Sequence, residues 1–258
     1  MNRILFEPAE ISPDGRAVFG GVRAEHVRTV LKGTVGQVLK TGVLGGDIGQ
    51  SAIEAISPES VTVRCTHDRP SLPPWCDLVL APPRPRVMKR LLPQLATIGV
   101  RRIFLVGAEK VEKAFWGAQL LKPEIYRPLL VEGLMQGAVS TMPPEIHQVR
   151  NFRRWLDAGD FERDFAGLNT RIVAHPLGGS RSCATVRFGR AGARPSHPMG
   201  TDPANVMGTV PVFAIGPEGG WTDAEVAMLE AHGFKRYALG PRILKTETAA
   251  IALLSRFI

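Results

Sequence analysis

Glycines and charged residues near the C-terminal end have types and spacing that suit ligand binding. Residues 215–220 read Ile-Gly-Pro-Glu-Gly-Gly, and residues 239–249 read Leu-Gly-Pro-Arg-Ile-Leu-Lys-Thr-Glu-Thr-Ala. Each segment stands where an apolar run ends and a helical pattern begins, and α/β proteins bind ligands at such strand-to-helix turns. Because only residues 221–238 separate the two segments, both turns can line one pocket.

The first segment favours a particular class of ligand. Its glycines, Gly216, Gly219 and Gly220, permit positive φ angles and a close approach of the backbone to a ligand. Their spacing differs from that of the phosphate-binding loops, and Glu218 would repel a phosphate. A neutral or cationic ligand held by backbone groups, such as S-adenosylmethionine, fits better. A tight turn that binds nothing is the alternative.

Two strand-and-helix pairs must position these turns. The apolar run that ends at Ile215 predicts a buried parallel strand, although Pro211 cannot donate to a sheet ladder. Thr222 and Glu225 form a capping box, which predicts a helix that begins there, and Gly233 is suited to end it.

The pattern then repeats up to the end of the sequence. Residues 237–239 predict a second short strand, followed by a helix from about Thr246. This helix is apolar almost all round at residues 249–254, so we expect it to be buried in its own subunit or paired with another one.

The two segments closely resemble the signature of the RsmE family, which belongs to the SPOUT superfamily of methyltransferases. The RsmE family methylates N3 of a uridine in small-subunit ribosomal RNA. The family pattern is a G-P-E-G-G loop, a helix and a final L-G-x-R-[IV]-L-[RK]-T-E-T-A. The chain matches it over residues 215–249, with Lys245 where the family usually has arginine. Weaker similarity covers a strand that ends in His-Pro at 175–176, the Glu-Lys pair at 109–110 and residues 25–32.

The resemblance implies a fold, a cofactor and partners. The fold would be α/β, with a SPOUT-type parallel sheet domain threaded as a trefoil knot over residues 75–258 and a small PUA-like β-barrel over residues 1–70. The cofactor would be S-adenosylmethionine, and the partners ribosomal RNA and a second copy of the chain in a homodimer. The residues that the resemblance places at the cofactor are His175, Pro176, Ile215, Gly216, Glu218, Gly219, Gly220, Leu239, Gly240, Ile243, Leu244, Thr246 and Glu247.

Methyl transfer from a sulfonium requires mainly the alignment of the reacting atoms, because the leaving thioether is neutral. A uridine imide must also lose its proton, and a nearby cation would stabilise the negative charge on the carbonyl oxygens. Arg242 is the first candidate for this catalytic cation and Lys245 the second. Salt bridges from these residues to Glu247 or Glu218 are the alternative.

The first 68 residues contain short apolar segments broken by glycine, at 17–20, 34–39, 51–56 and 61–64. Their alternation predicts a small β-barrel, with one helix at residues 25–32 and a proline-rich linker at residues 69–74. In the PUA-like domain that the resemblance implies, basic residues are candidates for RNA contact, and a solvated surface is their alternative role. The RNA-binding candidates of the whole chain are Arg3, His26, Arg28, Arg84 and Arg86.

From Asp77 onward, apolar runs at 78–81, 103–106, 146–149 and 172–174 alternate with segments of helical length, among them residues 124–140. This alternation predicts parallel strands with crossover helices, the pattern of an α/β sheet. Residues 187–205 are rich in Gly, Pro and Arg and predict a mobile loop.

The middle of the chain departs from the family pattern. Residues 82–90 replace a Lys-Gly-Asp/Glu loop with a proline- and arginine-rich sequence, and Pro93 is expected to interrupt the helix that follows. Residues 135–141 lack two family arginines. These departures leave open a different RNA nucleotide, a non-RNA acceptor, or a non-catalytic RNA-binding protein.

Composition agrees with a polyanionic partner. The 32 Lys and Arg residues exceed the 24 Asp and Glu residues, a formal net charge of +8, and basic proteins gain affinity by releasing counterions from nucleic acid. Basic residues gather at 84–90 and at Arg181, Arg187, Arg190 and Arg194, where a solvated face is the alternative. The start of the sequence does not resemble a signal peptide and no apolar run reaches 18 residues, so we expect a cytoplasmic protein that binds no membrane. The widely spaced Cys65, Cys76 and Cys183 predict no metal site.

Overall fold

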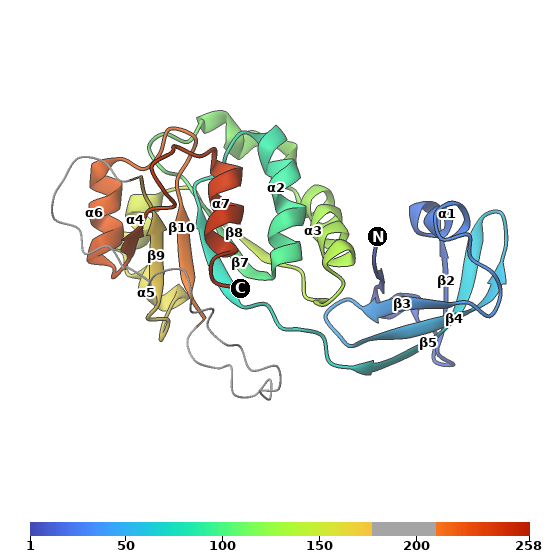
Figure 1. Cartoon of the computed structure of the whole chain (residues 1–258). Helices are drawn as coiled ribbons and strands as arrows, with labels where there is room; N and C mark the ends of the chain where they lie inside the picture. The colour runs from blue at the N-terminus through green and yellow to red at the C-terminus, as the bar shows by residue number, and fades with distance from the viewer. Residues whose placement is uncertain (177–209) are drawn as a thin grey trace. The chain divides into compact units, whose positions relative to one another are not determined.

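A computed structural model describes residues 1–176 and 210–258 (Figure 1). The chain forms two compact units, which are described separately. The first contains Met1–Pro74, Lys89–Arg101 and Gln119–Pro144, and the second contains Trp75–Met88, Arg102–Ala118 and Glu145–Ile258. The arginine cluster at 181–194, Cys183 and the loop expected at 187–205 lie outside the described residues.

The first unit contains a curled five-stranded sheet in the order β1-β3-β4-β5-β2. Strand β1 runs parallel to β3, and the other neighbours pair antiparallel. Alternate side chains such as Phe6, Phe19 and Val63 face a buried core that helix α1 covers through Ala24 and Val27. The elements are β1 Ile4–Phe6, β2 Arg16–Gly20, α1 Gly21–Thr29, β3 Val38–Val43, β4 Ile48–Ile56 and β5 Ser60–Arg69, with a 3₁₀ turn Pro8–Glu10.

Two sequence predictions in this unit need correction. Residues 34–39 were expected to form part of the barrel, but β3 begins only at Val38, because residues 34–37 form a turn in which Gly36 has a φ of +90°. The helix expected at residues 25–32 begins earlier, at Gly21, and ends at Thr29. Lys32, at φ 48°, lies in the left-handed region, where a helix does not continue.

Helix α2 (Pro85–Ile98) corrects a third prediction, because it continues through Pro93 without interruption. Proline inside a helix costs about 3 kcal/mol or more, since it removes a hydrogen bond and crowds the preceding turn. Its neighbours Leu91, Leu92 and Leu95 are buried, and burial of a leucine contributes about 1.5–3 kcal/mol each, which outweighs this cost. Helix α3 (Pro123–Gly137) confirms the helix expected over residues 124–140.

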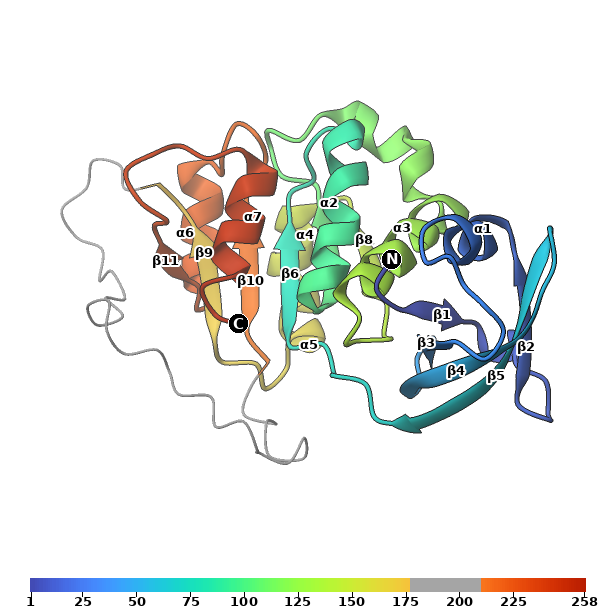
Figure 2. The same ribbon diagram turned by 45° about the vertical axis from the view of Figure 1, so that its right-hand side comes forward.

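The second sheet has six strands in the order β11-β9-β10-β6-β7-β8 (Figure 2). The pairings β11–β9, β9–β10, β10–β6 and β7–β8 are parallel, which confirms the α/β class expected from the alternating pattern. The strands are β6 Cys76–Leu80, β7 Val100–Val106, β8 Glu145–Val149, β9 Arg171–Ala174, β10 Val212–Ile215 and β11 Lys235–Tyr237. Pro211 stands just before β10, so it removes no hydrogen bond from the ladder.

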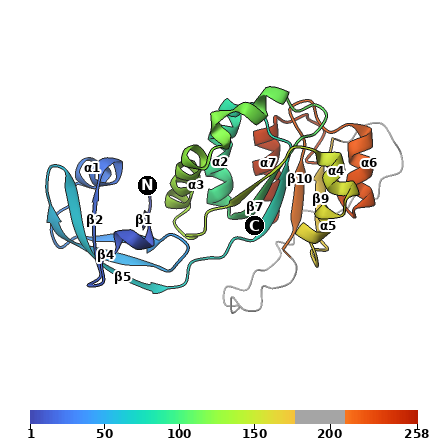
Figure 3. The ribbon, with the colours of Figure 1, turned by 180° about the vertical axis from the view of Figure 1, so that it is seen from behind.

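Helices cover this sheet on opposite faces, with α7 on one side and α4 and α5 on the other (Figures 1 and 3). An aromatic cluster joins α4 and α5 to the sheet. In it, Trp155 contacts Phe104, Phe161 and Phe165. The helices are α4 Phe152–Asp157, α5 Asp160–Asp164, α6 Asp223–Ala231 and α7 Thr246–Leu254, with a 3₁₀ turn Lys113–Gly117. A further 3₁₀ turn, Gln119–Leu121, belongs to the first unit.

The capping box that the sequence predicts is present at the start of α6. The Thr222 hydroxyl accepts a hydrogen bond from the backbone N–H of Glu225, and the Glu225 carboxylate accepts one from the backbone N–H of Thr222. Gly233 has a φ of +80° just after the helix, the conformation typical of a C-terminal stop. The second predicted strand, at 237–239, instead occupies Lys235–Tyr237.

Within residues 1–176 and 210–258, no helix has the length and hydropathy to cross a membrane. The same residues contain no group of three or more His, Cys, Asp or Glu side chains arranged to hold a metal ion.

Candidate functional site

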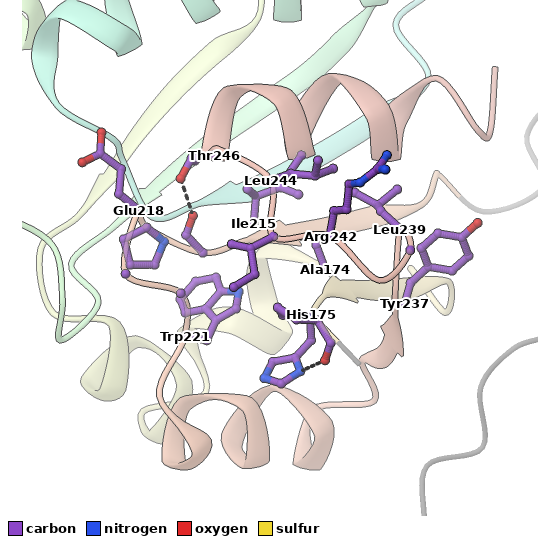
Figure 4. A pocket seen from close by; sticks show the side chains of 18 residues that line it. Ala174, His175, Ile215, Glu218, Trp221, Tyr237, Leu239, Arg242, Leu244 and Thr246 are labelled. Carbon is purple, nitrogen blue, oxygen red and sulfur yellow. Dashed lines mark hydrogen bonds between the residues drawn. The ribbon is translucent and has the colours of Figure 1, made fainter. Parts of the chain in front are cut away.

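The two glycine-containing segments line one cavity of about 260 Å³ in the second unit. It lies at the carboxyl ends of β9, β10 and β11, and the start of α7 closes one side (Figure 4). Its lining residues are Ala174, His175, Pro176, Ile215, Gly216, Pro217, Glu218, Gly219, Gly220, Trp221, Tyr237, Leu239, Gly240, Arg242, Ile243, Leu244, Thr246 and Ala249.

All but one of the residues that the sequence placed at a cofactor line this cavity. The exception is Glu247, which lies in the first turn of α7 and is partly buried. Of the two catalytic candidates, Arg242 lines the cavity and Lys245 does not. Sequence reasoning missed the walls that Trp221 and Tyr237 form, although both are adjacent to predicted turns.

Each glycine of the first loop is required for a different reason. Gly220 has a φ of +70°, a conformation that side chains rarely adopt. A Cβ at Gly216 would lie 3.0 Å from the Trp221 ring, and a Cβ at Gly219 would lie 3.0 Å from the Lys110 side chain. Positive φ therefore applies to one of the three glycines, and close packing explains the other two.

The cavity offers polar groups among mostly apolar walls. The indole N–H of Trp221 is buried and has no hydrogen-bond partner among the described residues. Leaving a buried donor unpaired costs free energy, so this N–H is available to a ligand acceptor. Near it, the Thr246 hydroxyl donates to the Gly216 carbonyl at 3.3 Å, which joins α7 to the first loop (Figure 4).

Two side chains hold the first loop from outside the cavity. Lys110 donates from Nζ to the Gly219 carbonyl at 2.9 Å. Glu225, which is only 7% exposed, accepts from the backbone N–H of Glu109 at 2.7 Å as well as from Thr222. The end of β7 is thereby fixed to the loop that follows β10.

Glu218 contributes its backbone to the cavity but not its charge. Figure 4 shows its carboxylate directed away from the other lining side chains. Outside the cavity it lies 3.6 Å from the Arg84 guanidinium, which also pairs with Glu112 at 3.0 Å. The two carboxylates raise the pKa of the Arg84 guanidinium above its ordinary value, through the Glu112 hydrogen bond first.

Arg242 extends along α7, on the side of the cavity opposite Trp221 (Figure 4). Arg242 and Lys245 are both exposed, and within residues 1–176 and 210–258 neither forms an ion pair. The alternative role of these residues, a salt bridge to Glu247 or Glu218, is therefore not observed among the described residues, and Glu218 pairs with Arg84 instead.

The candidate RNA-binding residues have different environments. Arg3 is only 6% exposed and donates to the carbonyls of Thr41, Gly49 and Ala138, so it stabilises the first unit from inside. Burial, and then the charge of Arg69, lower the pKa of Arg3.

The remaining candidates are closer to solvent. In α1, His26 and Arg28 are half-buried, and Arg28 donates to the Ser57 carbonyl at 3.4 Å. Arg84 and Arg86 are exposed at the start of α2.

The sequence and the fold both match known RNA methyltransferases. Residues 70–258 match the model of the RNA methyltransferase domain family. The chain is also 30% identical to the ribosomal RNA small subunit methyltransferase E of Treponema pallidum (strain Nichols), over 98% of this chain and 88% of that protein. The chain belongs to the RsmE family of RNA methyltransferases.

Two solved structures of similar proteins have this family's fold over almost the full chain. A ribosomal RNA small subunit methyltransferase E from Neisseria gonorrhoeae, bound to S-adenosyl methionine, has a TM-score of 0.71 at 21% identity and covers 99% of this chain and 96% of its own. A putative methyltransferase from Legionella pneumophila, in complex with the same cofactor, has a TM-score of 0.69 at 23% identity and the same coverage. These likenesses establish the α/β fold of an RsmE member for this chain.

Proposed function

We propose that this protein transfers a methyl group from S-adenosylmethionine to N3 of a uridine in 16S ribosomal RNA. The observation that carries the proposal is the single cavity formed by the two family segments, at the carboxyl edge of a parallel sheet. The name of the 30% identical relative supports ribosomal RNA of the small subunit as the acceptor class.

The residues of the cavity fit this cofactor. Residues 215–220 and 239–244 line it, and their glycines carry no side chain that would keep a ligand from the backbone. The Trp221 N–H supplies an unpaired donor. Among the eighteen lining residues, Arg242 and Glu218 are those with a full formal charge, and the Glu218 carboxylate points outside. When bound, S-adenosylmethionine supplies an electrophilic methyl group whose leaving group is a neutral thioether.

The chain's own contribution is to position the acceptor and stabilise its charge. Arg242 is the proposed catalytic cation, because it lines the cavity, is exposed and has no ion-pair partner among the described residues. Near the uracil carbonyl oxygens it would stabilise the anion left when N3 loses its proton. Lys245, three residues further along the same loop, is the second candidate.

The finer architecture is part of the proposal. We infer a SPOUT-type domain over residues 75–258, threaded as a trefoil knot, and a PUA-like RNA-binding domain over residues 1–70. We also infer that the protein is a homodimer and acts in the cytoplasm. Apolar side chains at the rim of the cavity support the dimer, since Ile243 is 87% exposed and Leu244 is 36% exposed.

Methyl mapping of ribosomal RNA tests this function directly. RNA from a strain that lacks the protein is expected to lose one N3-methyluridine in the small subunit, and the purified protein with cofactor should restore it. Calorimetry with S-adenosylmethionine is a separate test, because a protein that binds RNA but no cofactor would be a non-catalytic binder. Restoration of a methyl group on another nucleotide would show the same enzyme class with a different target.

A further inference from the structure

A second cavity of about 140 Å³ lies beside the cofactor cavity, at the carboxyl ends of β6, β7 and β10. This is little more than half the volume of the 260 Å³ cofactor cavity, so the space suits one ring rather than a nucleotide. Its lining residues are Pro82, Pro83, Arg84, Pro85, Lys110, Glu112, Phe115, Pro217, Glu218 and Gly219.

The two cavities share the wall formed by residues 217–219. In a methyl transfer, the acceptor atom must lie where the acceptor site meets the donor site. Glu218 stands at this border, because its backbone lines the first cavity while its carboxylate points away from that cavity toward Arg84 of the second.

The second cavity combines apolar residues with an equally large polar and charged lining. Phe115 is 2% exposed, and the neighbouring Pro82 and Pro83 are also buried. Flat apolar side chains of this kind hold a base that has been taken out of its stack. The charged edge consists of Arg84, placed between the carboxylates of Glu112 and Glu218.

This edge is complementary to uracil. The Watson–Crick edge of uracil presents an N3–H donor between two carbonyl acceptors, so a carboxylate suits N3–H and a guanidinium suits the neighbouring carbonyl. Cytosine has an unprotonated N3 at the same place, which a carboxylate would repel. An acidic and a basic side chain at this border therefore favour uracil over cytosine.

We propose that the second cavity receives the acceptor uracil, that Glu218 is the base that takes its N3 proton, and that Arg84 binds one of its carbonyl oxygens while Arg242 stabilises the other from the first cavity. The proposal rests on the proposed function. The N3–H bond breaks and its proton passes to the Glu218 carboxylate. The electron pair of N3 forms the new N–CH3 bond, and the pair of the broken S–CH3 bond leaves with the thioether. The proton on Glu218 then passes to solvent, to which the side chain is 42% exposed.

Lys110 acts here as a positioning residue. Its hydrogen bond to the Gly219 carbonyl holds the shared wall in place, and its side chain fills the space next to the Gly219 Cα. Residues 82–85, which replace the family's Lys-Gly-Asp/Glu loop, thus supply both an apolar wall and the guanidinium of Arg84.

The test compares Glu218→Gln and Arg84→Met with two matched surface controls, Glu145→Gln and Arg153→Met, whose side chains are 72% and 80% exposed. Cofactor affinity is measured by calorimetry, methyl transfer to small-subunit RNA by single-turnover kinetics, and binding of uridine and cytidine 5′-monophosphate by NMR shifts. Loss of a general base lowers a rate by about 10²–10⁴-fold.

We expect Glu218→Gln to keep its cofactor affinity and lose at least about 100-fold in the single-turnover rate. Arg84→Met should weaken binding of uridine monophosphate but not of cytidine monophosphate, and the controls should match the wild type. If the wild type is active and the Glu218→Gln variant is equally fast, this proposal alone is overturned. The same holds if the wild type binds uridine and cytidine monophosphate equally well. A wild type that transfers no methyl group to RNA overturns the proposed function itself.

Discussion

The carboxylate of Glu225 accepts a hydrogen bond from the backbone N–H of Glu109 at 2.7 Å, across 116 residues of chain. The same carboxylate caps helix α6, so one buried side chain joins the end of β7 to the helix that follows the cofactor loop. Two contacts thereby fix the cofactor loop from outside the cavity. Lys110 binds the Gly219 carbonyl, and Glu225 binds the helix that follows the loop to the end of β7.

Replacement of Glu225 by alanine should destabilise the second unit. Two backbone N–H groups would lose their acceptor, and a buried donor left unpaired costs about 1–3 kcal/mol. Urea unfolding measures this loss as a lower midpoint. Glu230→Ala is the control, because the exposed Glu230–Arg236 pair contributes only about 0–1 kcal/mol. Equal midpoints for both variants would contradict the role given to Glu225.

Cofactor binding should depend on the glycine loop. Gly220→Val must adopt a φ of +70°, which costs roughly 1–2 kcal/mol or more for a residue with a side chain, and Gly219→Val must displace Lys110. Calorimetry should show loss of S-adenosylmethionine binding while circular dichroism stays unchanged. Gly117→Val is the matched control, since its Cβ would meet nothing within 4 Å. Wild-type affinity in both loop variants would refute the assignment of the cavity.

Arg242→Met is expected to lower the rate of methyl transfer by about 10²–10³-fold, the effect of removing one group that stabilises developing negative charge. Cofactor affinity should change little, because the guanidinium extends along α7 away from Trp221. Lys245→Met should have a smaller effect, since Lys245 does not line the cavity. If Lys245→Met lowers the rate of methyl transfer more than Arg242→Met does, Lys245 and not Arg242 is the catalytic cation.

Stability should decrease at acidic pH through His67. Burial, and then the charge of Arg3, lower the pKa of this imidazole below its ordinary value of 6.5, while the hydroxyl of Thr41 lies 2.8 Å from its Nε2. Below pH 6.5 the unfolded chain binds a proton that the folded chain binds only at a lower pH, so folding becomes less favourable. The free energy of unfolding should therefore fall from pH 7.5 to 5.5, and less steeply in His67→Gln. Parallel curves for the two proteins would exclude His67 as the cause.

The protein is expected to be a homodimer with the last helix near the interface. Within the subunit, Ala250, Leu253 and Leu254 of α7 are buried, whereas Ile251 is half-buried and Ile243 and Leu244, just before the helix, are exposed. Ile243→Asp should shift the mass seen by light scattering at micromolar concentration from dimer to monomer. A monomeric wild type with full activity would refute the dimer.

Sequence patterns predicted the elements of the second unit well, because strands buried on both faces are continuous apolar runs. Val212–Ile215 is fully buried, and the Thr222–Glu225 capping box marks the start of α6 without ambiguity. The first unit was harder. Strand β1 has only three residues, and β5 continues to Arg69 through polar residues that no periodicity distinguishes from a linker.

The cavity could be predicted where glycines in the sequence mark the turns that form it. It was harder to predict where contacts between distant residues determine the structure. Gly216, Gly219 and Gly220 pointed to the cavity, but Gly216 is required by the packing of Trp221 and Gly219 by that of Lys110, which is 109 residues away in the sequence. The pairing of Glu218 with Arg84 joins residues from different strand ends. No spacing rule within one segment could have predicted it.

The hydrogen bonds of the chain's first residues have a consequence for folding during synthesis. The backbone N–H groups of Asn2 and Arg3 donate to Met135, and the Arg3 guanidinium donates to Ala138. The sheet that begins with β1 cannot complete these bonds until residue 138 has left the ribosome, which at about 5–20 residues per second takes on the order of ten seconds. Until then the backbone N–H groups of Asn2 and Arg3 lack these partners and are open to chaperones, although β1 itself can already pair with β3.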